Sequence, residues 1–505
     1  MSNSSDISSV HSNESSASSS SINEKLHSGS EESNQKILTT FAGFAGNVNN
    51  MLGSVSIYST PGIVWQTVDS PGIALILWIF GGFISSCGSL TYVEFGTITL
   101  ESGGETGFFK KAFPEPRLLA SYLFSFAWIC AIRPASLGAA LQTVAQYFLF
   151  AIIPHPPKDT NAENYCQELY QFHQRLNPNN EWGILKIIGI AALAIITLYH
   201  MLSNGLANKI NQALAVVKML TLIVIIIIGF VQLIRTDISK PNWQNPFQDI
   251  ENLKLPNLAS ALISVFFAYN GWNNLNYSLD EFKDPKGKLV YSNSLSVTVV
   301  TILYALTNVA FITVVKSEDV NKPGKDFNEL IAGTFAKEIG GEDFARVLSF
   351  FVALSAFGAV SSMTWRFHHK RYTPYNALLV QFVWCVMVFV ILGGAFSSDA
   401  FKLLSDFATY FAWIFYFLAS VGLLWLRYKE PEILRPFKVW IVLTVILVCS
   451  AIFIIIGNAI ELDMQPTHLT PNAVCQEDAK TIKNYIKSII CIGCLIVGTG
   501  CCQLN

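Results

Sequence analysis

The fold of this chain is decided by one stretch, residues 258–281, which reads LASALISVFFAYNGWNNLNYSLDE. It begins as an apolar run of membrane length, and Asn270, Gly271, Asn273 and Asn274 interrupt it near its middle. Hydrocarbon offers no hydrogen-bond partner to free backbone groups, so a loosened helix is tolerated in a membrane only where it lines a protein-buried or water-filled cavity. We therefore interpret this interruption as a binding site.

A second interruption lies in the first apolar segment, where residues 54–62 read SVSIYSTPG. By helix count the two interrupted segments are five helices apart. Two broken helices at matching positions in successive halves of a chain are typical of secondary transporters, which bind their substrate between them. Glycine and proline also kink packed membrane helices without forming a site, and the recurrence of the break in both halves favours the site.

The composition predicts a membrane protein. The 505 residues are 51% hydrophobic and only 13% charged, with a mean hydropathy of +0.42, which is too apolar for an ordinary soluble protein of this size. We expect an all-α polytopic fold of about twelve transmembrane helices. A net charge of −2 provides no basic footprint for a nucleic-acid partner.

The chain divides into four predicted regions. Residues 1–40 are rich in serine and poor in apolar residues, so we expect a disordered cytoplasmic tail. Residues 41–234 hold helices one to five, residues 235–426 hold helices six to ten with a shortening after the eighth, and residues 427–505 hold two peripheral helices and the C-terminus. Basic residues gather in the alternate short loops that are cytoplasmic if the N-terminus is inside, so this orientation follows.

A broken helix suits a zwitterion. The break frees N–H groups on one side and C=O groups on the other. The N–H groups and the positive end of the helix dipole attract a carboxylate, and the carbonyl oxygens accept hydrogen bonds from an ammonium group. A free amino acid is therefore the expected ligand, with Phe267, Tyr269 and Trp272 as apolar walls.

Lys218 is a second candidate functional residue, because it lies deep in the fifth apolar segment. An unpaired ammonium at that depth costs about 2.5–3.5 kcal/mol. One hypothesis is that its charge replaces a bound sodium ion by donating to carbonyls freed at the first break. The alternative is that its long side chain reaches the membrane surface. Arg133 is equally deep, and we assign it a structural role beside Pro134.

Two of the ten cysteines, Cys166 and Cys475, fall outside the membrane in this topology, where disulfides persist. They pair with each other, or Cys166 binds a partner chain, or both are free thiols. The chain has no HExxH motif, no CxxC framework and no GxSxG elbow, and Gly103-Gly104 lacks the Lys-Ser/Thr signature of a phosphate loop. We therefore expect neither an enzyme, nor a cofactor, nor a metal site.

Several ordered motifs carry a family resemblance, together with the lysine of the fifth segment. They are SVSIYSTP at 54–61, YVEFG at 92–96, IRP at 132–134, FAYNGWN at 267–273 and WLRYKEPE at 425–432. With these motifs the chain resembles the amino acid-polyamine-organocation (APC) superfamily, and within it the L-type amino acid transporters and the fungal methionine permeases.

The resemblance implies a five-plus-five inverted repeat of the kind found in bacterial leucine transporters, with helices one and six broken. It implies that backbone at Ser54, Val55, Ser56 and Ile57 binds the substrate carboxylate. On the other side of the substrate, carbonyls of the segment Phe267, Ala268, Tyr269 and Asn270 would bind the ammonium, with Phe267 as a gate. Lys218 would make sodium unnecessary.

The implied function is transport of neutral L-amino acids, methionine or other large neutral ones, across the plasma membrane. It would proceed by sodium-independent alternating access, as exchange, facilitated uptake or proton symport. Animal relatives bind a heavy-chain subunit through a disulfide in the loop that contains Cys166, so such a partner is open here.

The chain departs from the family pattern at three places. Ser54 and Ser56 replace two glycines of the first break, and Asn270 replaces a glycine of the second. The added side chains narrow the pocket and favour substrates smaller or more polar than the bulkiest neutral amino acids. The family's connection between helices eight and nine is shortened between Val360 and Thr373. A non-transporting amino-acid sensor, or an inactive splice or gene-model variant, is therefore the alternative.

Overall fold

The computed structural model of the chain describes residues 40–52, 56–116, 118–152, 183–235, 240–247, 250–279, 285–320, 330–365, 375–394 and 400–461. All regular structure in these ranges is helical. The predictions for the N-terminal tail, Ser54, Val55, Cys166, Cys475 and the last apolar run fall outside the described residues.

The first half begins with a helix in two pieces, α2 (Thr40–Leu52) and α3 (Thr60–Val68), with the short η1 (Ser56–Tyr58) between them. The elements that follow are α4 (Pro71–Thr99), α5 (Glu105–Ala112), α6 (Leu119–Ala127), η2 (Trp128–Ile132), α7 (Arg133–Ile152), α9 (Ile184–Leu202) and α10 (Asn204–Arg235). Proline occupies the first turn of α3 and of α4, where its missing N–H leaves no helical bond unmade.

The second half repeats this plan, since its first long helix is also in two pieces, α12 (Leu255–Tyr269) and η5 (Asn274–Tyr277). The other elements are α11 (Lys240–Gln244), η4 (Ile250–Asn252), α13 (Pro285–Val314), α14 (Ser317–Val320), α15 (Ile331–Trp365), α16 (Tyr375–Gly394), α17 (Ala400–Lys429) and α18 (Ile441–Glu461). Within the described part of the chain, seven helices are long and apolar enough to cross a membrane, and α12, α16 and α18 contain shorter apolar spans.

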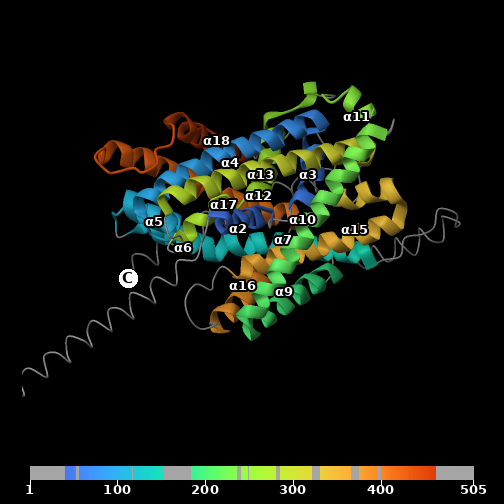
Figure 1. The fold of residues 1–505 in the computed structure, drawn as a ribbon, viewed down its shortest axis with the longest axis horizontal. Helices are drawn as coiled ribbons and strands as arrows, with labels where there is room; N and C mark the ends of the chain where they lie inside the picture. Colours follow the sequence, from blue (N-terminus) through green and yellow to red (C-terminus); the bar gives the residue numbers. More distant parts are fainter. Residues whose placement is uncertain are drawn as a thin grey trace, which may run out of the picture.

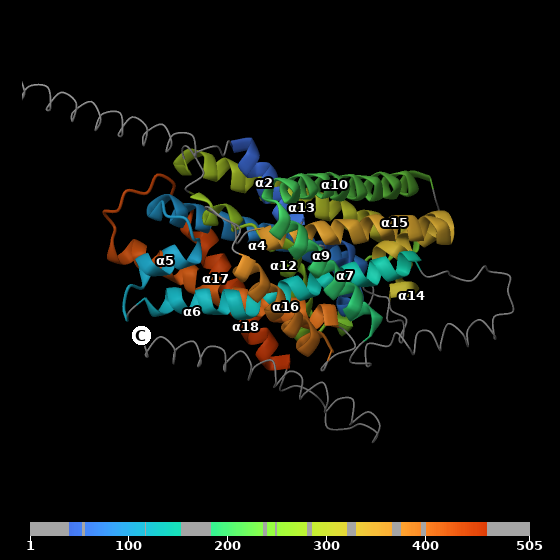
Figure 2. The ribbon, with the colours of Figure 1, turned by 90° about the horizontal axis from the view of Figure 1, so that it is seen from below.

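Helices pack against their counterparts from the other half. The pairs α3 with α12, α4 with α13, α7 with α15, and α9 with α16 are all in contact. Figure 1 shows α4 beside α13 and α9 beside α16, and Figure 2 shows the same bundle from below. Each pair joins a helix to the one five places later, as the inverted repeat requires. The predicted polytopic all-α fold is confirmed.

The outside of the bundle is apolar, as lipid requires. On α9 and α10, exposed side chains include Ile195, Leu198, Leu220 and Ile227, each with more than half of its surface exposed. On a soluble protein an exposed apolar patch of this kind indicates an interaction site or a tendency to aggregate. On a helix of membrane length it is the face that contacts the hydrocarbon of the bilayer.

A buried ion pair fixes one end of the bundle. Glu94 of α4 is fully buried and accepts hydrogen bonds from both Nε and Nη2 of Arg427 on α17, and from the backbone N–H of Val439 at 2.8 Å. Arg435 Nε lies 3.5 Å from the same carboxylate. Breaking such a pair costs about 3–5 kcal/mol. The YVEFG and WLRYKEPE motifs therefore occur together because they make one contact.

Candidate functional site

The first break separates α2 from α3. Residues 53–55 of this break lie outside the described part of the chain, so the structure describes Ser56 and Ile57 but not Ser54 or Val55. Ser56 and Ile57 form η1 with Tyr58, and all three are buried. The chain re-enters a regular helix only at Thr60, so backbone groups on both sides of the break are outside the α-helical ladder.

The second break follows Tyr269. Asn270 has extended backbone angles (φ −55°, ψ 137°) and Gly271 has a φ of +110°, a conformation that favours glycine. A Cβ at Gly271 would also lie 2.6 Å from the side-chain amide nitrogen of Asn274, so a larger residue would strain the backbone and push the Asn274 side chain aside. The helix resumes as a 3-10 turn at Asn274, which makes the predicted interruption a real change of backbone direction.

A tyrosine of α13 joins the two breaks. The hydroxyl of Tyr304 lies 3.0 Å from the carbonyl oxygen of Met51, just before the first break, and 3.0 Å from that of Ala268, just before the second. All three residues are fully buried. The single O–H group thus lies within hydrogen-bond distance of a buried carbonyl beside each break, and a hydrogen bond of this kind contributes about 0.5–1.5 kcal/mol. The sequence carries no signal that predicts this role for Tyr304.

A small cavity lies beside the second break. Its lining comes from α2, η2, α7, α12, the second break, η5 and α15, and comprises Asn50, Trp128, Ile132, Arg133, Ser136, Phe267, Asn270, Gly271, Asn274, Ala359, Ser362 and Met363. Its volume of about 30 Å³ has room for about two water molecules. The helices must therefore separate before anything as large as an amino acid enters.

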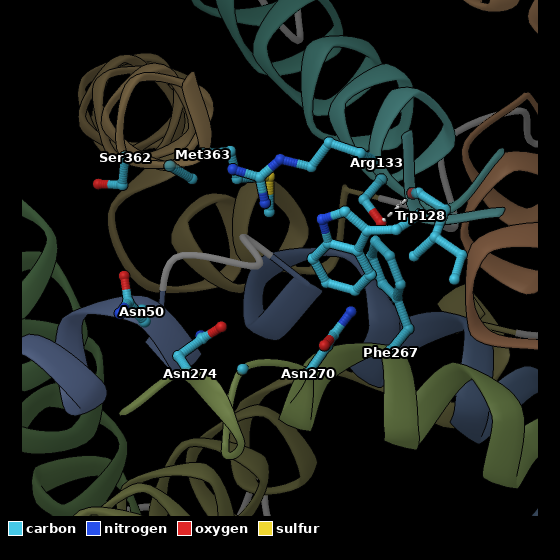
Figure 3. Close-up of a pocket in the computed structure, with 12 residues that line it drawn as sticks. Asn50, Trp128, Arg133, Phe267, Asn270, Asn274, Ser362 and Met363 are labelled. Carbon is cyan, nitrogen blue, oxygen red and sulfur yellow. Dashed lines mark hydrogen bonds between the residues drawn. The ribbon is translucent and has the colours of Figure 1, made fainter. Parts of the chain in front are cut away.

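Figure 3 shows how side chains converge on this cavity. Arg133, Trp128 and Phe267 point into one space from α7, η2 and α12, and Asn270 and Asn274 face it from the second break. The π-helical turn η2 places Trp128 just ahead of Arg133, and turns of this type are frequent at functional sites. Arg133, to which the sequence assigned a structural role, is thus part of the cavity wall.

The predicted aromatic walls divide between two places. Phe267 lines the cavity and packs edge-on against Phe401 with ring centroids 5.9 Å apart. The Tyr269 hydroxyl instead donates to the Trp78 carbonyl at 2.9 Å, away from the cavity. Trp272 lines a second, smaller cavity on the opposite side of the break, together with Trp413 and other residues of α12 and α17.

Asn270 is the residue common to both cavities. It stands at the point where helix α12 stops, with its backbone turned out of the helix. Its side chain therefore occupies space between the two cavities that a glycine would leave open.

Lys218 reaches the first broken helix. Its side chain is 2% exposed, and its Nζ lies 3.1 Å from the side-chain oxygen of Asn49 and 3.4 Å from the Asn49 backbone carbonyl. In return, the Tyr58 hydroxyl donates to the Lys218 carbonyl at 3.3 Å. The lysine therefore holds both sides of the first break to α10, and its ammonium group turns into the bundle.

The chain is similar to known proteins over most of its length. The sequence profile of the family named Amino acid permease matches residues 38–367 and 364–492, and the two matches meet in the shortened connection after α15. The mouse "Large neutral amino acids transporter small subunit 2" is 27% identical over 490 residues, covering 89% of this chain and 84% of its own length.

Two further mouse proteins are similar over most of the chain. "Asc-type amino acid transporter 1" is 27% identical over 439 residues, covering 83% of this chain and 75% of its own. "b(0,+)-type amino acid transporter 1" is 26% identical over 447 residues, covering 84% and 83%. The profile match spans well over half of the sequence, so the chain belongs to the amino acid permease family, within the APC superfamily, and is a membrane transport protein and not an enzyme.

Proposed function

We propose that this permease transports neutral L-amino acids, methionine or another large neutral one, without sodium. The observation that carries the proposal is the pair of helix breaks: the Tyr304 hydroxyl lies 3.0 Å from a carbonyl oxygen just before each break, and the second break lines a cavity. A zwitterion needs a donor-rich pocket for its carboxylate and an acceptor-rich one for its ammonium group, and two opposed helix breaks supply both.

In this proposal the substrate carboxylate binds backbone N–H groups of the segment Ser54, Val55, Ser56 and Ile57. The ammonium group donates to carbonyls of the segment Phe267, Ala268, Tyr269 and Asn270. Phe267 closes over the site. In the empty site the Ala268 carbonyl accepts a hydrogen bond from the Tyr304 hydroxyl. When the substrate enters, its ammonium group competes for this carbonyl and displaces the tyrosine.

Lys218 takes the place of a sodium ion. Its ammonium group already bridges α10 and the Asn49 carbonyl of α2, which is the electrostatic task that a bound cation would perform there. The transport mode is exchange, facilitated uptake or proton symport. In each mode the substrate site at the breaks opens alternately to the two sides of the membrane.

We place the N-terminus in the cytoplasm, because basic residues gather in the loops on that side. We place the protein in the plasma membrane by analogy with the transporters that it resembles. A heavy-chain-like partner, linked through Cys166, is the proposed assembly, and the printed name "small subunit" of a related transporter supports it. Treatment with a reducing agent should lower the apparent mass on a gel, and Cys166→Ser should abolish the shift.

A second function is favoured by the shortened connection after α15. The family profile aligns in two pieces that meet at residues 364–367, which supports the reading of a shortened gate in this proposal. A protein that binds an amino acid but cannot complete the cycle would act as a sensor. Binding without transport is the signature that separates the two functions.

Uptake by proteoliposomes tests the proposal. The purified protein should carry labelled methionine into vesicles in sodium-free buffer, and preloading the vesicles with unlabelled methionine reports on exchange. We expect saturable uptake that other large neutral amino acids inhibit and that lysine and glutamate do not. Saturable binding of methionine, with no uptake under any gradient, would show that the protein acts as a sensor and not as a transporter.

A further inference from the structure

Glu105 is a buried carboxyl group that the substrate site described above does not use. It is fully buried and is the first residue of α5, which lies between the membrane-spanning helix α4 and the span formed by α6 and α7. The Asn273 side-chain amide donates to its Oε1 at 2.7 Å, and the Tyr277 hydroxyl donates to its Oε2. Both donors belong to the second break.

The surroundings of Glu105 are polar but neutral. Tyr92 faces it from α4, Tyr277 from η5 and Tyr416 from α17. The packed face of α6 contributes only the hydroxyls of Ser121 and Ser125, which bond to Thr106. Among the described residues, no lysine or arginine forms an ion pair with Glu105. Burial therefore raises the pKa of this carboxyl group, although the hydrogen bonds from Tyr277, Asn273 and Tyr92 oppose the rise.

The same segment of chain touches Glu105 and the substrate cavity. Asn273 holds the carboxyl group, while its neighbours Gly271 and Asn274 line the cavity. Tyr277 packs against Trp128, another cavity residue, with ring centroids 5.7 Å apart. Any change in the bonds that Glu105 makes is thus transmitted to the cavity wall through the second break.

We propose that Glu105 is the proton-binding group that couples amino-acid movement through this permease to the movement of a proton. The inference rests on the proposed transport function and selects proton symport among its modes. A carboxyl group that lies beside the helix break, and that pairs with no lysine or arginine in the described part of the chain, is placed to gain a proton in one state and lose it in another.

The hydrogen bonds define the coupling step. The ionised carboxylate accepts from both Asn273 and Tyr277, and so ties the second break to α5. A proton on Oε2 turns that acceptor into a donor, so the Tyr277 hydroxyl must rotate from donating to accepting, and its bond to Glu105 loses the negative charge that strengthened it. Protonation therefore loosens η5 from α5, and loss of the proton on the other side of the membrane restores the tie.

The test compares Glu105→Gln with wild type in proteoliposomes that contain a pH-sensitive dye. This substitution imitates the permanently protonated state, and Glu101→Gln is the control because Glu101 is exposed and pairs only with Lys110. We expect wild type and Glu101→Gln to acidify the lumen as methionine enters and to accumulate methionine under an inward proton gradient. Glu105→Gln should lose both effects, and its methionine exchange should become constant from about pH 5 to about pH 8.

Three results would overturn the inference. Wild-type methionine uptake without acidification of the lumen would support the transport function but show that no proton is coupled to it. If Glu105→Gln acidified the lumen as much as wild type, Glu105 would not be the proton-binding group. If Glu105→Gln does not fold, Tyr277→Phe provides the test. This variant removes a donor to the carboxylate, so the pH of half-maximal uptake should shift to a higher value. An unshifted pH profile of uptake contradicts the proposal. Absence of any methionine uptake in wild type would instead refute the proposed function itself.

Discussion

At the scale of single residues, the second break depends on side chains whose sizes are matched to narrow spaces. A Cβ at Gly271 would displace the Asn274 side chain and strain the backbone, and Asn270 fills the gap between two cavities. Substrate selection at such a site follows from volume, since one methylene in an apolar pocket changes the transport ratio by about 10-fold or more.

Asn270→Gly should therefore broaden the substrate range. Removing the side chain joins the two cavities, so we expect uptake of phenylalanine and tryptophan to rise relative to methionine on the order of tenfold. The measurement is the ratio of kcat/KM values in proteoliposomes, with Asn270→Ala expected to lie between the two. An unchanged ratio would show that the Asn270 side chain does not limit substrate size.

Lys218→Met should disable sodium-free transport. The methionine keeps the length and apolar packing of the side chain but removes the donor to the Asn49 oxygens, so α2 loses its tie to α10. We expect uptake to fall by about tenfold or more, in line with the loss of a charged hydrogen bond. Lys209→Met, at an exposed position of the same helix, is the control. Normal uptake by Lys218→Met with unchanged ion dependence would refute the role of Lys218.

The sequence predicted one side of the site well and missed the other. Gly271 and the asparagines around it predict the second break, because polar and permissive residues interrupt an apolar run of membrane length there. Trp128, Ser362 and Met363 reach the same cavity from helices distant in the chain. Nothing local marks them, since an aromatic or hydroxyl residue in a membrane helix is ordinary.

At the scale of helices and turns, the molecule compensates for its broken helices with specific donors. Tyr304 joins the two breaks, and Asn273 and Tyr277 tie the second break to α5. The breaks themselves were predictable from sequence, because each carries glycine inside a run of membrane length. Their partners were not, because a single tyrosine in α13 and a glutamate after Gly103-Gly104 have no spacing relation to the breaks.

Tyr304→Phe should destabilise the protein. It leaves the Met51 and Ala268 carbonyls buried without this donor, and a lost buried hydrogen bond of this kind costs about 1–3 kcal/mol. Thermal unfolding in detergent measures the loss, with Tyr291→Phe as the control because Tyr291 is 72% exposed on the same helix. Equal melting temperatures for the two variants would mean that the breaks do not depend on the Tyr304 hydroxyl.

At the scale of the whole molecule, paired halves surround a contracted cavity, so transport requires the halves to separate. The pairing of α4 with α13 and of α7 with α15 leaves the breaks at the centre of the bundle. The fold class followed from composition and the two breaks, whereas the tightness of the cavity did not, because it depends on how distant side chains interlock.

The buried Glu105 makes the stability of the whole fold depend on pH. Its raised pKa means that the folded protein keeps the proton at pH values where the unfolded chain has lost it, so stability falls as pH rises through this window. Glu105→Gln has no proton to lose. We therefore expect its melting temperature to gain on wild type as pH increases, while Glu101→Gln tracks wild type. A gap that narrows with rising pH would contradict the assignment.

The central claim is that the two helix breaks bind the two charged ends of one amino acid. A cryo-EM map of the protein with L-methionine at saturating concentration tests it most directly. We predict density for the ligand between the breaks, with its carboxylate on the N–H groups of residues 54–57 and its ammonium group on the carbonyls of residues 267–270. Methionine bound elsewhere, or continuous helices through both segments, would contradict the claim.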